Sequence, residues 1–390
     1  MSTRRVLLVE VNRDGTVGGS HQAMFDLART LDRRRYLPVC LFYEKNSFAD
    51  RLRGLGFEVL LWDAEWEREH LTPSRWFTPR RAMGIVGAVA RRVALLRAQR
   101  IDLVHINNSP SWSYYDWLPA ARMVGIPCIT HLRGELHPMR NGIVRWLTSR
   151  FDHYISISSY VTEILRSERF PSQRITQIED GVDAENLRRS VRRSRADVRA
   201  DLGVPSDALL AVMAGHLKEW KGQDVVLRAL AGLAPELRAR ISVAFAGSDD
   251  PRSTAFRKHL DDLVRTHQLE SCVQFLGRRD DVPDLMNAAD IVLHASTRPE
   301  PFGLVLVEGM ALGRLVIAAA LGGPVQIMGE DSDWIFDPRV PSQLTRLLRR
   351  VIERPEIAAE NTSVSVARAE AYSARRTTHR VQNLYDQLLA

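Results

Sequence analysis

Two glutamates with seven residues between them stand in the most informative segment of the sequence. Residues 298–313 read Arg-Pro-Glu-Pro-Phe-Gly-Leu-Val-Leu-Val-Glu-Gly-Met-Ala-Leu-Gly, so Glu300 precedes a Pro-Phe-Gly turn and Glu308 lies in an apolar run. A helix that begins near Gly303 points its first N–H groups and its positive dipole end at an anion such as a phosphate. The helix is otherwise apolar, so we expect it to be buried, with Glu308 paired to hydrogen-bond donors. Vicinal hydroxyls of a ligand would serve, and an ion pair with Arg314 is the structural alternative.

A second segment combines a glycine turn with two lysines. Residues 212–222 read Val-Met-Ala-Gly-His-Leu-Lys-Glu-Trp-Lys-Gly, and the chain has only two further lysines among its 54 basic residues. A cation beside a leaving diphosphate stabilises the negative charge that develops as the bond to the diphosphate breaks. The compact ammonium group of Lys221 is predicted to have this role.

These residues need a scaffold that gathers the ends of several strands. The apolar run 6–11, the glycines that follow it and a helical pattern from residue 19 are typical of the opening of a doubly wound α/β domain. Further strands are predicted at 37–42, 57–61, 103–106, 127–130, 153–157, 209–214, 241–246, 272–276, 291–295 and 315–319. They alternate with helical stretches, which favours parallel sheets. The arginine-rich stretch 183–201 is predicted to be the boundary between two domains and a solvated helix.

The order of these motifs resembles that of the retaining GT-B glycosyltransferases of family 4, the group 1 type, whose signature is the spacing EX7E. The resemblance is strongest over residues 209–330, where Gly-Arg-Leu-Val-Ile-Ala and Gly-Gly-Pro follow in the family's order. It implies that Glu308 holds the ribose hydroxyls of a nucleotide and that Glu300 contacts the donor sugar. It also implies that three backbone amides contact sugar and phosphate, those of Phe302, Gly303 and Leu304.

The lysine segment departs from the family at one position. An arginine and a lysine hold the donor diphosphate in the family; Lys221 corresponds to the lysine, whereas His216 stands where the arginine usually is. An imidazole can be neutral at pH 7 and cannot make the two parallel hydrogen bonds that a guanidinium makes to a phosphate. Lys218 is expected to compensate.

The resemblance is looser in the first half. It implies that Gly18 and Gly19 lie near the donor phosphate, and a tight turn before a helix explains the same glycines. It also implies that His131, in Thr-His-Leu-Arg-Gly at 130–134, lies near the donor anomeric centre, and a structural histidine is the alternative. Two groups of aromatic residues are candidate acceptor contacts. The first is the cluster at 112–117, which core packing explains equally well, and the second is Trp62, Trp66 and Trp76.

The implied fold class is α/β of the GT-B type, two Rossmann-like doubly wound parallel-sheet domains with a cleft between them. Residues 1–184 would form an acceptor domain completed by a C-terminal helix at about 374–390, and residues 198–373 a nucleotide-sugar donor domain. The chain is expected to be a hexosyltransferase that moves a sugar from a UDP- or GDP-sugar to a glycan or lipid-linked glycan, as in bacterial polysaccharide or glycolipid biosynthesis. His131, Lys221 and Glu300 are the catalytic candidates.

The mechanism implied is a same-face displacement with retention of configuration. No carboxylate stands out as the nucleophile that a double displacement of the glycosidase kind needs. In the same-face scheme the leaving phosphate helps to deprotonate the acceptor. Two alternatives remain: a nucleotide-sugar epimerase on the same fold, and a non-catalytic nucleotide-sugar binding homologue, which His216 brings into consideration.

Charge and composition limit the partners. Residues 1–200 carry a net charge of about +10 and the remainder about −3, within a total of +7, so an anionic partner is expected at the first half. Without a nucleic-acid-binding motif we expect no nucleic acid, and favour a lipid-linked substrate or an anionic membrane, with residues 80–100 as a basic amphipathic stretch.

Metal, cofactor and export signals are not expected. The three cysteines are far apart and form no zinc-binding or disulfide pattern. Asp331-Ser332-Asp333 matches a DxD tripeptide by letter only, so no metal or cofactor is predicted. Residues 1–11 lack the features of a signal peptide, and charges and glycines interrupt the apolar run 301–328. The expected location is the cytoplasm, with peripheral contact to the inner face of the plasma membrane.

Overall fold

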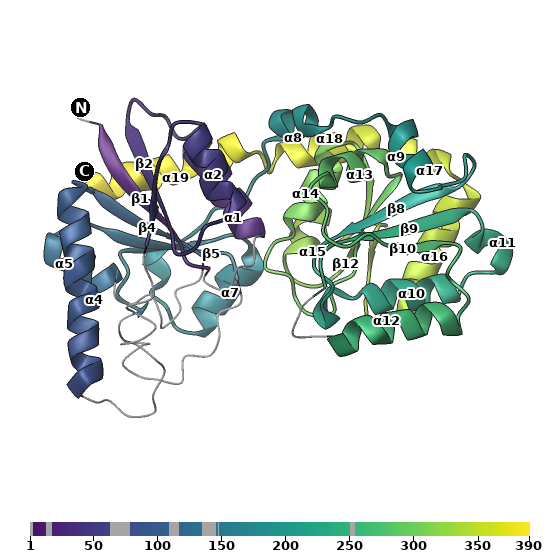
Figure 1. Cartoon of the computed structure of the whole chain (residues 1–390), viewed down its shortest axis with the longest axis horizontal. Helices are drawn as coiled ribbons and strands as arrows, with labels where there is room; N and C mark the ends of the chain where they lie inside the picture. The colour runs from purple at the N-terminus through teal and green to yellow at the C-terminus, as the bar shows by residue number, and fades with distance from the viewer. Residues whose placement is uncertain are drawn as a thin grey trace. The chain divides into compact units, whose positions relative to one another are not determined.

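A computed structural model describes residues 3–12, 18–62, 79–108, 117–134, 146, 148–249 and 254–390. The chain divides into two compact units (Figure 1), residues 1–180 together with 374–390, and residues 181–373. Trp66, Trp76 and the aromatic residues at 112–115 lie outside the described residues.

The first unit holds a seven-stranded parallel sheet in the order β3-β2-β1-β4-β5-β6-β7. Its strands are β1 Arg4–Glu10, β2 Tyr36–Phe42, β3 Glu58–Leu61, β4 Leu103–Asn107, β5 Cys128–Leu132, β6 His153–Ser156 and β7 Ile175–Gln177. Strand order reverses between β1 and β4, the position at which doubly wound sheets bind ligands. The register pairs Glu10 with Asn107 and Asn107 with His131, so three polar residues meet at the carboxyl edge.

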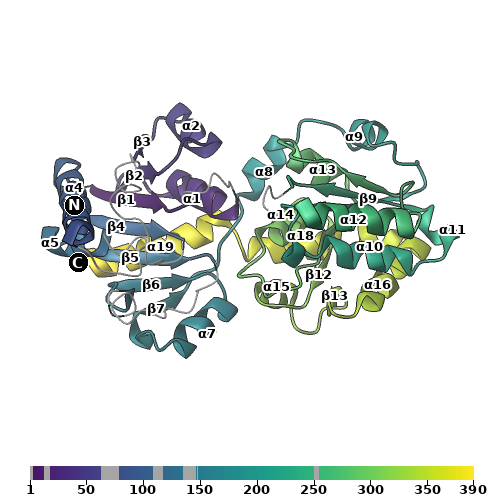
Figure 2. The ribbon, with the colours of Figure 1, turned by 60° about the horizontal axis from the view of Figure 1, so that its bottom comes forward.

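Helices cover this sheet because its strands are apolar on both faces. The helices are α1 Gly19–Thr30, α2 Ser47–Gly54, α4 Pro79–Ala98, α5 Trp117–Val124, α7 Ser159–Ser167 and α19 Ala374–Leu389. The last of them runs across the first sheet (Figure 2), and Val381, Leu384 and Tyr385 enter its core. Thr377 and Arg380 of α19 donate hydrogen bonds to the carbonyls of Glu179 and Gln177. The C-terminal helix is therefore part of the first unit.

The second unit holds a six-stranded parallel sheet in the order β10-β9-β8-β11-β12-β13. Its strands are β8 Leu209–Ala214, β9 Ile241–Ala246, β10 Val273–Phe275, β11 Ile291–His294, β12 Leu315–Ala319 and β13 Ile335–Phe336. The helices are α8 Ala184–Ser190, α9 Arg195–Asp201, α10 Gln223–Ala231, α11 Pro235–Arg238, α12 Thr254–Thr266, α13 Val282–Ala288, α14 Leu304–Ala311, α15 Gly323–Met328, α16 Pro341–Glu353, α17 Glu356–Glu360 and α18 Thr362–Glu370. Two parallel-sheet, Rossmann-like units confirm the expected α/β fold class.

The arginine-rich stretch differs from its prediction as a solvated helix. It forms α8 and α9, and two of its arginines dock on the second unit. Arg195 donates to the carbonyls of Asn287 and Ala289, and both Arg195 and Arg199 pair with Asp290. Cations that bind the free carbonyls at the end of α13 complement the negative end of that helix, so part of the positive charge holds the fold.

No helix among the described residues is both long enough and apolar enough to cross a bilayer.

Candidate functional site

Close backbone contacts at two glycines join three loops at the carboxyl edge of the second sheet. Gly222 has φ +77°, and a Cβ there would lie 1.9 Å from the carbonyl oxygen of Ala295. Gly322 also has φ +77°, and a Cβ there would lie 2.4 Å from the carbonyl oxygen of Glu300, whose carbonyl accepts the N–H of Gly323 at 2.8 Å. Only glycine fits such approaches, so the loops after β8, β11 and β12 are held against one another.

This packing brings Lys221 to Glu300. The Nζ of Lys221 lies 2.7 Å from Oε2 of Glu300, and their side chains are 23% and 14% exposed. Ser296 donates its hydroxyl to the same oxygen at 3.0 Å, and Nε2 of His294 lies 3.4 Å from it. The ammonium group also lies 4.0 Å from the centre of the Trp220 ring. Two residues predicted from separate motifs therefore meet in one cluster.

The cluster keeps Glu300 ionised. Burial by itself would raise the pKa of this carboxyl, but the charge of Lys221 and the contact with His294 outweigh burial and hold the pKa well below its usual range. Glu300 is therefore a hydrogen-bond acceptor at neutral pH, able to bind sugar hydroxyls. Lys221 is a cation on a flexible four-carbon chain, its partner here is the Glu300 carboxylate, and a phosphate oxygen would compete for the same three N–H donors.

The predicted helix is α14, which begins after Gly303. This glycine is the N-cap, with φ +108°, and its position offers no side chain to cap the helix. Phe302 is buried and its ring packs edge-on against Tyr372 at 5.7 Å between centroids. Gly323 packs directly against the backbone of Phe302, where a Cβ would lie 2.5 Å from the Cα atom, so the turn before α14 is fixed on both sides.

Glu308 differs from the expectation of a helix that is apolar and buried on every other face. It is half-buried, as is Leu304 one turn before it, so the two share a partly open stripe of α14, while Leu306, Val307 and Met310 are buried. Burial therefore penalises the Glu308 carboxylate less than expected. A half-exposed carboxylate can accept hydrogen bonds from ligand hydroxyls without first leaving the core.

His216 follows Gly215, the residue after β8. Its Nδ1 lies 2.8 Å from the hydroxyl of Ser248, and its carbonyl accepts a hydrogen bond from Gln223 at 3.1 Å. These contacts tie the loop after β8 to the loop after β9 and to α10. Lys218, two residues along, is half-buried.

A buried polar network lies at the carboxyl edge of the first sheet. Glu10, Asn107 and Asp180 are almost completely buried, as are His131 and the side chain of Arg133. Arg133 donates through Nε to both oxygens of Asp180, at 3.0 and 2.9 Å. The network places His131 in the interior of the first unit, with no exposed surface.

Burial sets the protonation of the titratable groups here. Desolvation lowers the pKa of His131 well below its usual value, and the charge of Arg133 adds to this effect. His105, which stacks on His131 at 5.4 Å, has its pKa lowered to about 3 by the same two causes. Desolvation raises the pKa of Glu10 to about 7, although hydrogen bonds from Asn12 and Asn107 oppose the shift. Both imidazoles are therefore neutral at physiological pH.

The glycine turn before α1 is described only in part. Gly18 is the N-cap of α1 in an extended conformation, and a Cβ there would meet nothing within 4 Å. Packing thus does not require glycine at this position. Gly19 is the first residue of α1, and the carbonyl of Ser20 accepts a hydrogen bond from Asn107 at 3.0 Å.

Two aromatic residues predicted as candidate acceptor contacts belong to the core. Trp62 and Trp117 are buried, with ring centroids 5.7 Å apart, and the guanidinium of Arg92 lies about 5 Å from both rings. The indole N–H of Trp117 donates to the hydroxyl of Tyr43 at 2.8 Å. Core packing accounts for both tryptophans.

The sequence interpretation did not select several residues of these clusters. His294 and Ser296 hold Glu300, and Glu10, Asn107, Arg133 and Asp180 form the first-unit network. All stand at or just after the carboxyl ends of strands, and this position is the signal that could have identified them.

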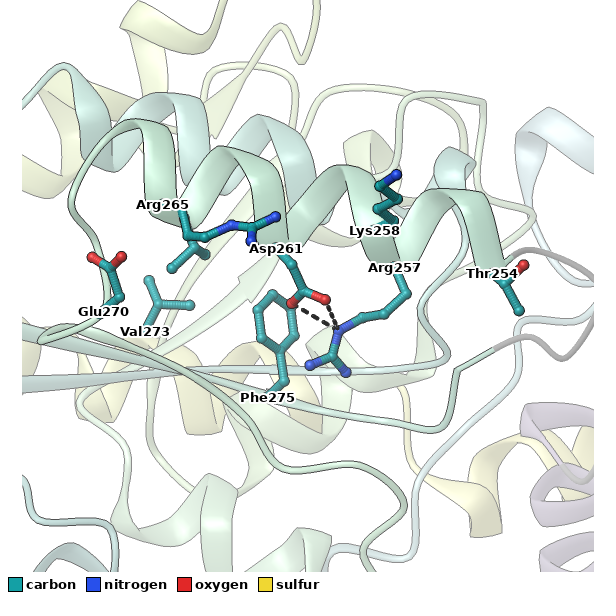
Figure 3. Close-up of a pocket in the computed structure, with 9 residues that line it drawn as sticks. Thr254, Arg257, Lys258, Asp261, Arg265, Glu270, Val273 and Phe275 are labelled. Atoms are coloured by element: carbon teal, nitrogen blue, oxygen red, sulfur yellow. Dashed lines mark hydrogen bonds and ion pairs between the residues drawn. The ribbon is translucent and has the colours of Figure 1, made fainter.

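Two cavities lie apart from the candidate residues. One of about 640 Å³ runs along α12 and β10 (Figure 3), where Arg257 bonds Asp261 and lies 4.4 Å from the Phe275 ring centre. The other, about 440 Å³, is lined in part by Asp331 and Asp333. Within the described ranges, no three His, Cys, Asp or Glu side chains are grouped so that they could hold a metal ion.

Solved structures share the fold along the whole chain. Anabaena Alr3699/HepE, solved in complex with UDP, superposes with a TM-score of 0.81 at 23% identity, covering 99% of this chain and 100% of the other. A glycosyltransferase from Rickettsia africae gives a TM-score of 0.82 at 18% identity, with 100% and 99% covered.

Curated relatives match in part. D-inositol 3-phosphate glycosyltransferases are 34% identical over 222 residues in Saccharomonospora viridis and 30% identical over 217 residues in Streptomyces scabiei. These matches cover 55% and 54% of this chain, and 51% and 48% of the relatives, so the chain spans about half the length of the curated relatives it matches.

Two family models cover nearly the whole chain in sequence. Residues 17–186 match the model Glycosyltransferase Family 4, and residues 194–363 match Glycosyl transferases group 1. The matched segments coincide closely with the two parallel-sheet units. Fold, family models and relatives agree, and the chain belongs to the GT-B glycosyltransferases of the family 4 and group 1 type.

Proposed function

We propose that the protein is a retaining glycosyltransferase that moves a sugar from a nucleotide-diphosphate sugar to a hydroxyl of a glycan or lipid-linked glycan. The observation that carries the proposal is the Lys221–Glu300 pair in the same loop cluster as the N-terminus of α14. A UDP-sugar is the favoured donor class, because the Anabaena protein with the same fold was solved with UDP and with UDP-glucose. The curated relatives, named as inositol phosphate glycosyltransferases, support a hydroxyl acceptor.

In the proposed mechanism Lys221 gives up its ion pair with Glu300 and binds the donor diphosphate instead. The diphosphate takes hydrogen bonds from Lys221 and from the first backbone N–H groups after Gly303, and these positive groups stabilise the leaving diphosphate. Glu300, held by Ser296 and His294, accepts hydrogen bonds from the sugar hydroxyls. Glu308 accepts the ribose hydroxyls on the half-open stripe of α14.

We propose that these groups make a metal ion unnecessary. Lys221 and the helix dipole supply positive charge at the diphosphate, the place where a divalent cation would otherwise act. In the same-face displacement the leaving phosphate oxygen takes the proton of the acceptor hydroxyl while the new glycosidic bond forms on the face that the diphosphate leaves. In this scheme His131 contacts the donor sugar after the residues that cover it move aside, because its side chain has no exposed surface.

The first unit is proposed to contact an anionic membrane surface from the cytoplasmic side. Helix α4 exposes Met83 and Val86, which are 74% and 68% exposed, within a stretch rich in arginine. Apolar side chains next to arginines suit the boundary between headgroups and acyl chains. Sedimentation with anionic and with neutral vesicles tests this contact.

Ligand-induced thermal stabilisation tests the donor site. We expect UDP and UDP-sugars to raise the melting temperature of the wild-type protein and to lose this effect in Glu308→Ala, because the ribose contact is gone. GDP-, ADP- and dTDP-sugars are the comparison series. Glu353→Ala, a carboxylate removed from the far end of α16, is the matched control and should keep the shift. A folded wild-type protein that no nucleotide stabilises would refute the proposal.

The non-catalytic alternative rests on His216, and a measurement of sugar transfer by the wild type and by His216→Arg distinguishes it from an active enzyme. If the protein binds UDP-glucose without transfer, and His216→Arg transfers glucose to an acceptor or to water, the natural chain is a binding homologue. Equal turnover in both forms indicates an enzyme in which Lys218 compensates for the missing arginine. Conversion of the donor sugar without an acceptor would indicate an epimerase.

A further inference from the structure

Arg133 lies just after β5 and its side chain is only 3% exposed. Each nitrogen of its guanidinium has a different partner. Nε donates to both carboxylate oxygens of Asp180, one terminal nitrogen donates to Oδ1 of Asn107, and the other lies 3.0 Å from Nδ1 of His131. A planar guanidinium with three such partners cannot rotate without losing hydrogen bonds inside the protein.

Asn107 fixes the direction of this arrangement. Its amide nitrogen donates to Oε2 of Glu10 and to the carbonyl of Ser20, at 3.0 Å for the latter. The Ser20 carbonyl can only accept and the Arg133 guanidinium can only donate, so the amide nitrogen must face Ser20 and the amide oxygen must face Arg133. The orientation of Arg133 is thus set from both sides, by Asn107 and by Asp180.

The contact with His131 determines where the imidazole carries its proton. A guanidinium has only donors, so the nitrogen that faces it must be an acceptor without hydrogen. The neutral ring then carries its proton on Nε2. That nitrogen is buried and lies 3.8 Å from Oδ1 of Asp180. The backbone of Ile178 acts as a hydrogen-bond acceptor toward the ring, which also favours a proton on the side away from Arg133.

The other groups around the ring do not reverse this assignment. His105 stacks on the face of His131, and its own Nδ1 bonds the hydroxyl of Tyr385 from α19. The Asp180 carboxylate is the one negative group that the described residues place beside the ring, and Arg133 already bonds both of its oxygens. Its charge is therefore compensated and does not draw a second proton onto His131.

We propose that Arg133 is a positioning residue that holds His131 neutral, with its proton on Nε2, so that His131 serves as a hydrogen-bond donor and not as a base. The role toward a donor sugar rests on the proposed function. A ring that offers only an N–H cannot accept the acceptor proton. The proton must then go to another group, as in the same-face mechanism, where the leaving phosphate takes it.

Histidine ring nitrogen shifts test the proposal on the full-length protein. In protein labelled with ¹⁵N-histidine, the His131 signals are assigned by their loss in His131→Gln. We expect an unprotonated, acceptor-type shift at Nδ1 and a protonated shift at Nε2 across pH about 5–8, where a free imidazole would titrate. A proton on Nδ1, or a charged ring at neutral pH, would overturn the proposal. The measurement is made on the wild-type protein, and His131→Gln is needed only to assign the signals.

Arg133→Met tests the role of the guanidinium. It leaves the Asp180 carboxylate uncompensated beside the ring, so we expect His131 to become protonated at both nitrogens near neutral pH. Arg133→Met/Asp180→Asn removes that charge as well and should return a neutral ring. Arg5→Met removes an arginine from the opposite edge of the same sheet, where Arg5 bonds Gln99 and Glu58, and should leave the His131 shifts unchanged. Ring shifts that stay the same in Arg133→Met contradict the proposal.

Addition of UDP-glucose separates this inference from the proposed function. If UDP-glucose binds, we expect the Nε2 and Hε2 shifts of His131 to move while Nδ1 stays unprotonated. Bound UDP-glucose that leaves Nε2 unaffected would overturn the role toward the sugar. Absence of binding by UDP and UDP-glucose would refute the proposed donor, while the ring state measured without ligand would still decide the role of Arg133.

Discussion

Replacing Lys221 by methionine tests the idea that Lys221 and Glu300 are each other's partner until a diphosphate arrives. The substitution keeps the length of the side chain and removes its charge. Glu300 would then be a carboxylate with 14% of its side chain exposed and without a cation at 2.7 Å. Among the residues that the structure describes, the hydroxyl of Ser296 and the imidazole of His294 would remain as its polar side-chain contacts.

The expected loss of stability follows from the burial of the pair. Breaking a fully buried ion pair costs about 3–5 kcal/mol, and a charge-assisted hydrogen bond contributes about 1.5–3 kcal/mol. Because both side chains keep some exposure, we expect Lys221→Met to lower the free energy of unfolding by about 2–3 kcal/mol at neutral pH. For a unit of this size, that corresponds to a melting temperature lower by roughly 4–12 °C.

The effect should depend on pH in a defined direction. The folded-state pKa of Glu300 is held well below that of the unfolded chain, so the pair contributes stability above pH about 4.5 and loses it as the pH falls toward the folded pKa. In Lys221→Met burial is no longer opposed by the ammonium group, and the carboxyl pKa rises. Protonation of Glu300 in acid then removes its unpaired buried charge from the variant. The difference in the free energy of unfolding between wild type and variant should therefore shrink as the pH falls from about 8 to about 4.

A double-mutant cycle measured by urea unfolding decides the matter. Glu300→Gln removes the charge that needs Lys221, so Lys221→Met/Glu300→Gln should be less destabilised than the sum of the single variants by about 1.5–3 kcal/mol. Lys221→Arg, which keeps a cation, is the matched control and should retain most of the stability. Additive single variants, or a cost for Lys221→Met that does not change with pH, would refute the reasoning.

Two further predictions concern single positions. Gly222→Ala should destabilise the protein by more than about 2 kcal/mol in urea unfolding, because a Cβ would lie 1.9 Å from the Ala295 carbonyl oxygen. Gly277→Ala, at a residue with φ +64° and open space around it, should cost only the backbone strain of about 1 kcal/mol. Equal costs in the two variants would show that the contact with Ala295 has no effect. The wild type should lose roughly 3 kcal/mol of its free energy of unfolding between pH 4.5 and about 7, because the buried Glu10 carboxyl keeps its proton to about pH 7 while the unfolded chain releases it near 4.5. Glu10→Gln should remove this loss. Parallel plots of unfolding free energy against pH for wild type and variant would contradict the prediction.

The alternation of apolar runs and helical stretches was enough to predict the fold class. Each predicted strand of the second half is close to an observed one, from β8 to β12, because buried parallel strands are uniformly apolar and are ended by glycine or polar turns. Strand order, by contrast, depends on contacts between distant segments. The two-residue strand β13, which pairs with β12, carries too short an apolar signal to be recognised.

In the candidate site, too, local patterns were predictable from the sequence and contacts between distant segments were not. Glu300 and Lys221 were identified because each belongs to a local strand, turn and helix pattern, but their contact arises from loops 79 residues apart in the sequence. Glu308 was expected to be buried because its neighbours are apolar, and which face of a helix the fold leaves open is a tertiary property. Trp62 and Trp117 show the same limit, since aromatic residues suit both a core and a sugar-binding surface.

The two clusters use different cations, and the difference matches their proposed roles. Arg133 distributes its donors over Asp180, Asn107 and His131, so it cannot leave one partner without disturbing the others. Lys221 has its ion pair with Glu300, through an ammonium group on a flexible chain, and can turn to a phosphate without breaking a fork of parallel hydrogen bonds. A fixed guanidinium suits the setting of a histidine proton, and an exchangeable ammonium suits a ligand that arrives and leaves. Lys221→Arg should therefore keep most of the stability of its cluster and still weaken the exchange with a phosphate, whereas Arg133→Lys should lose the setting of the His131 proton, even though the charge at each place would be unchanged.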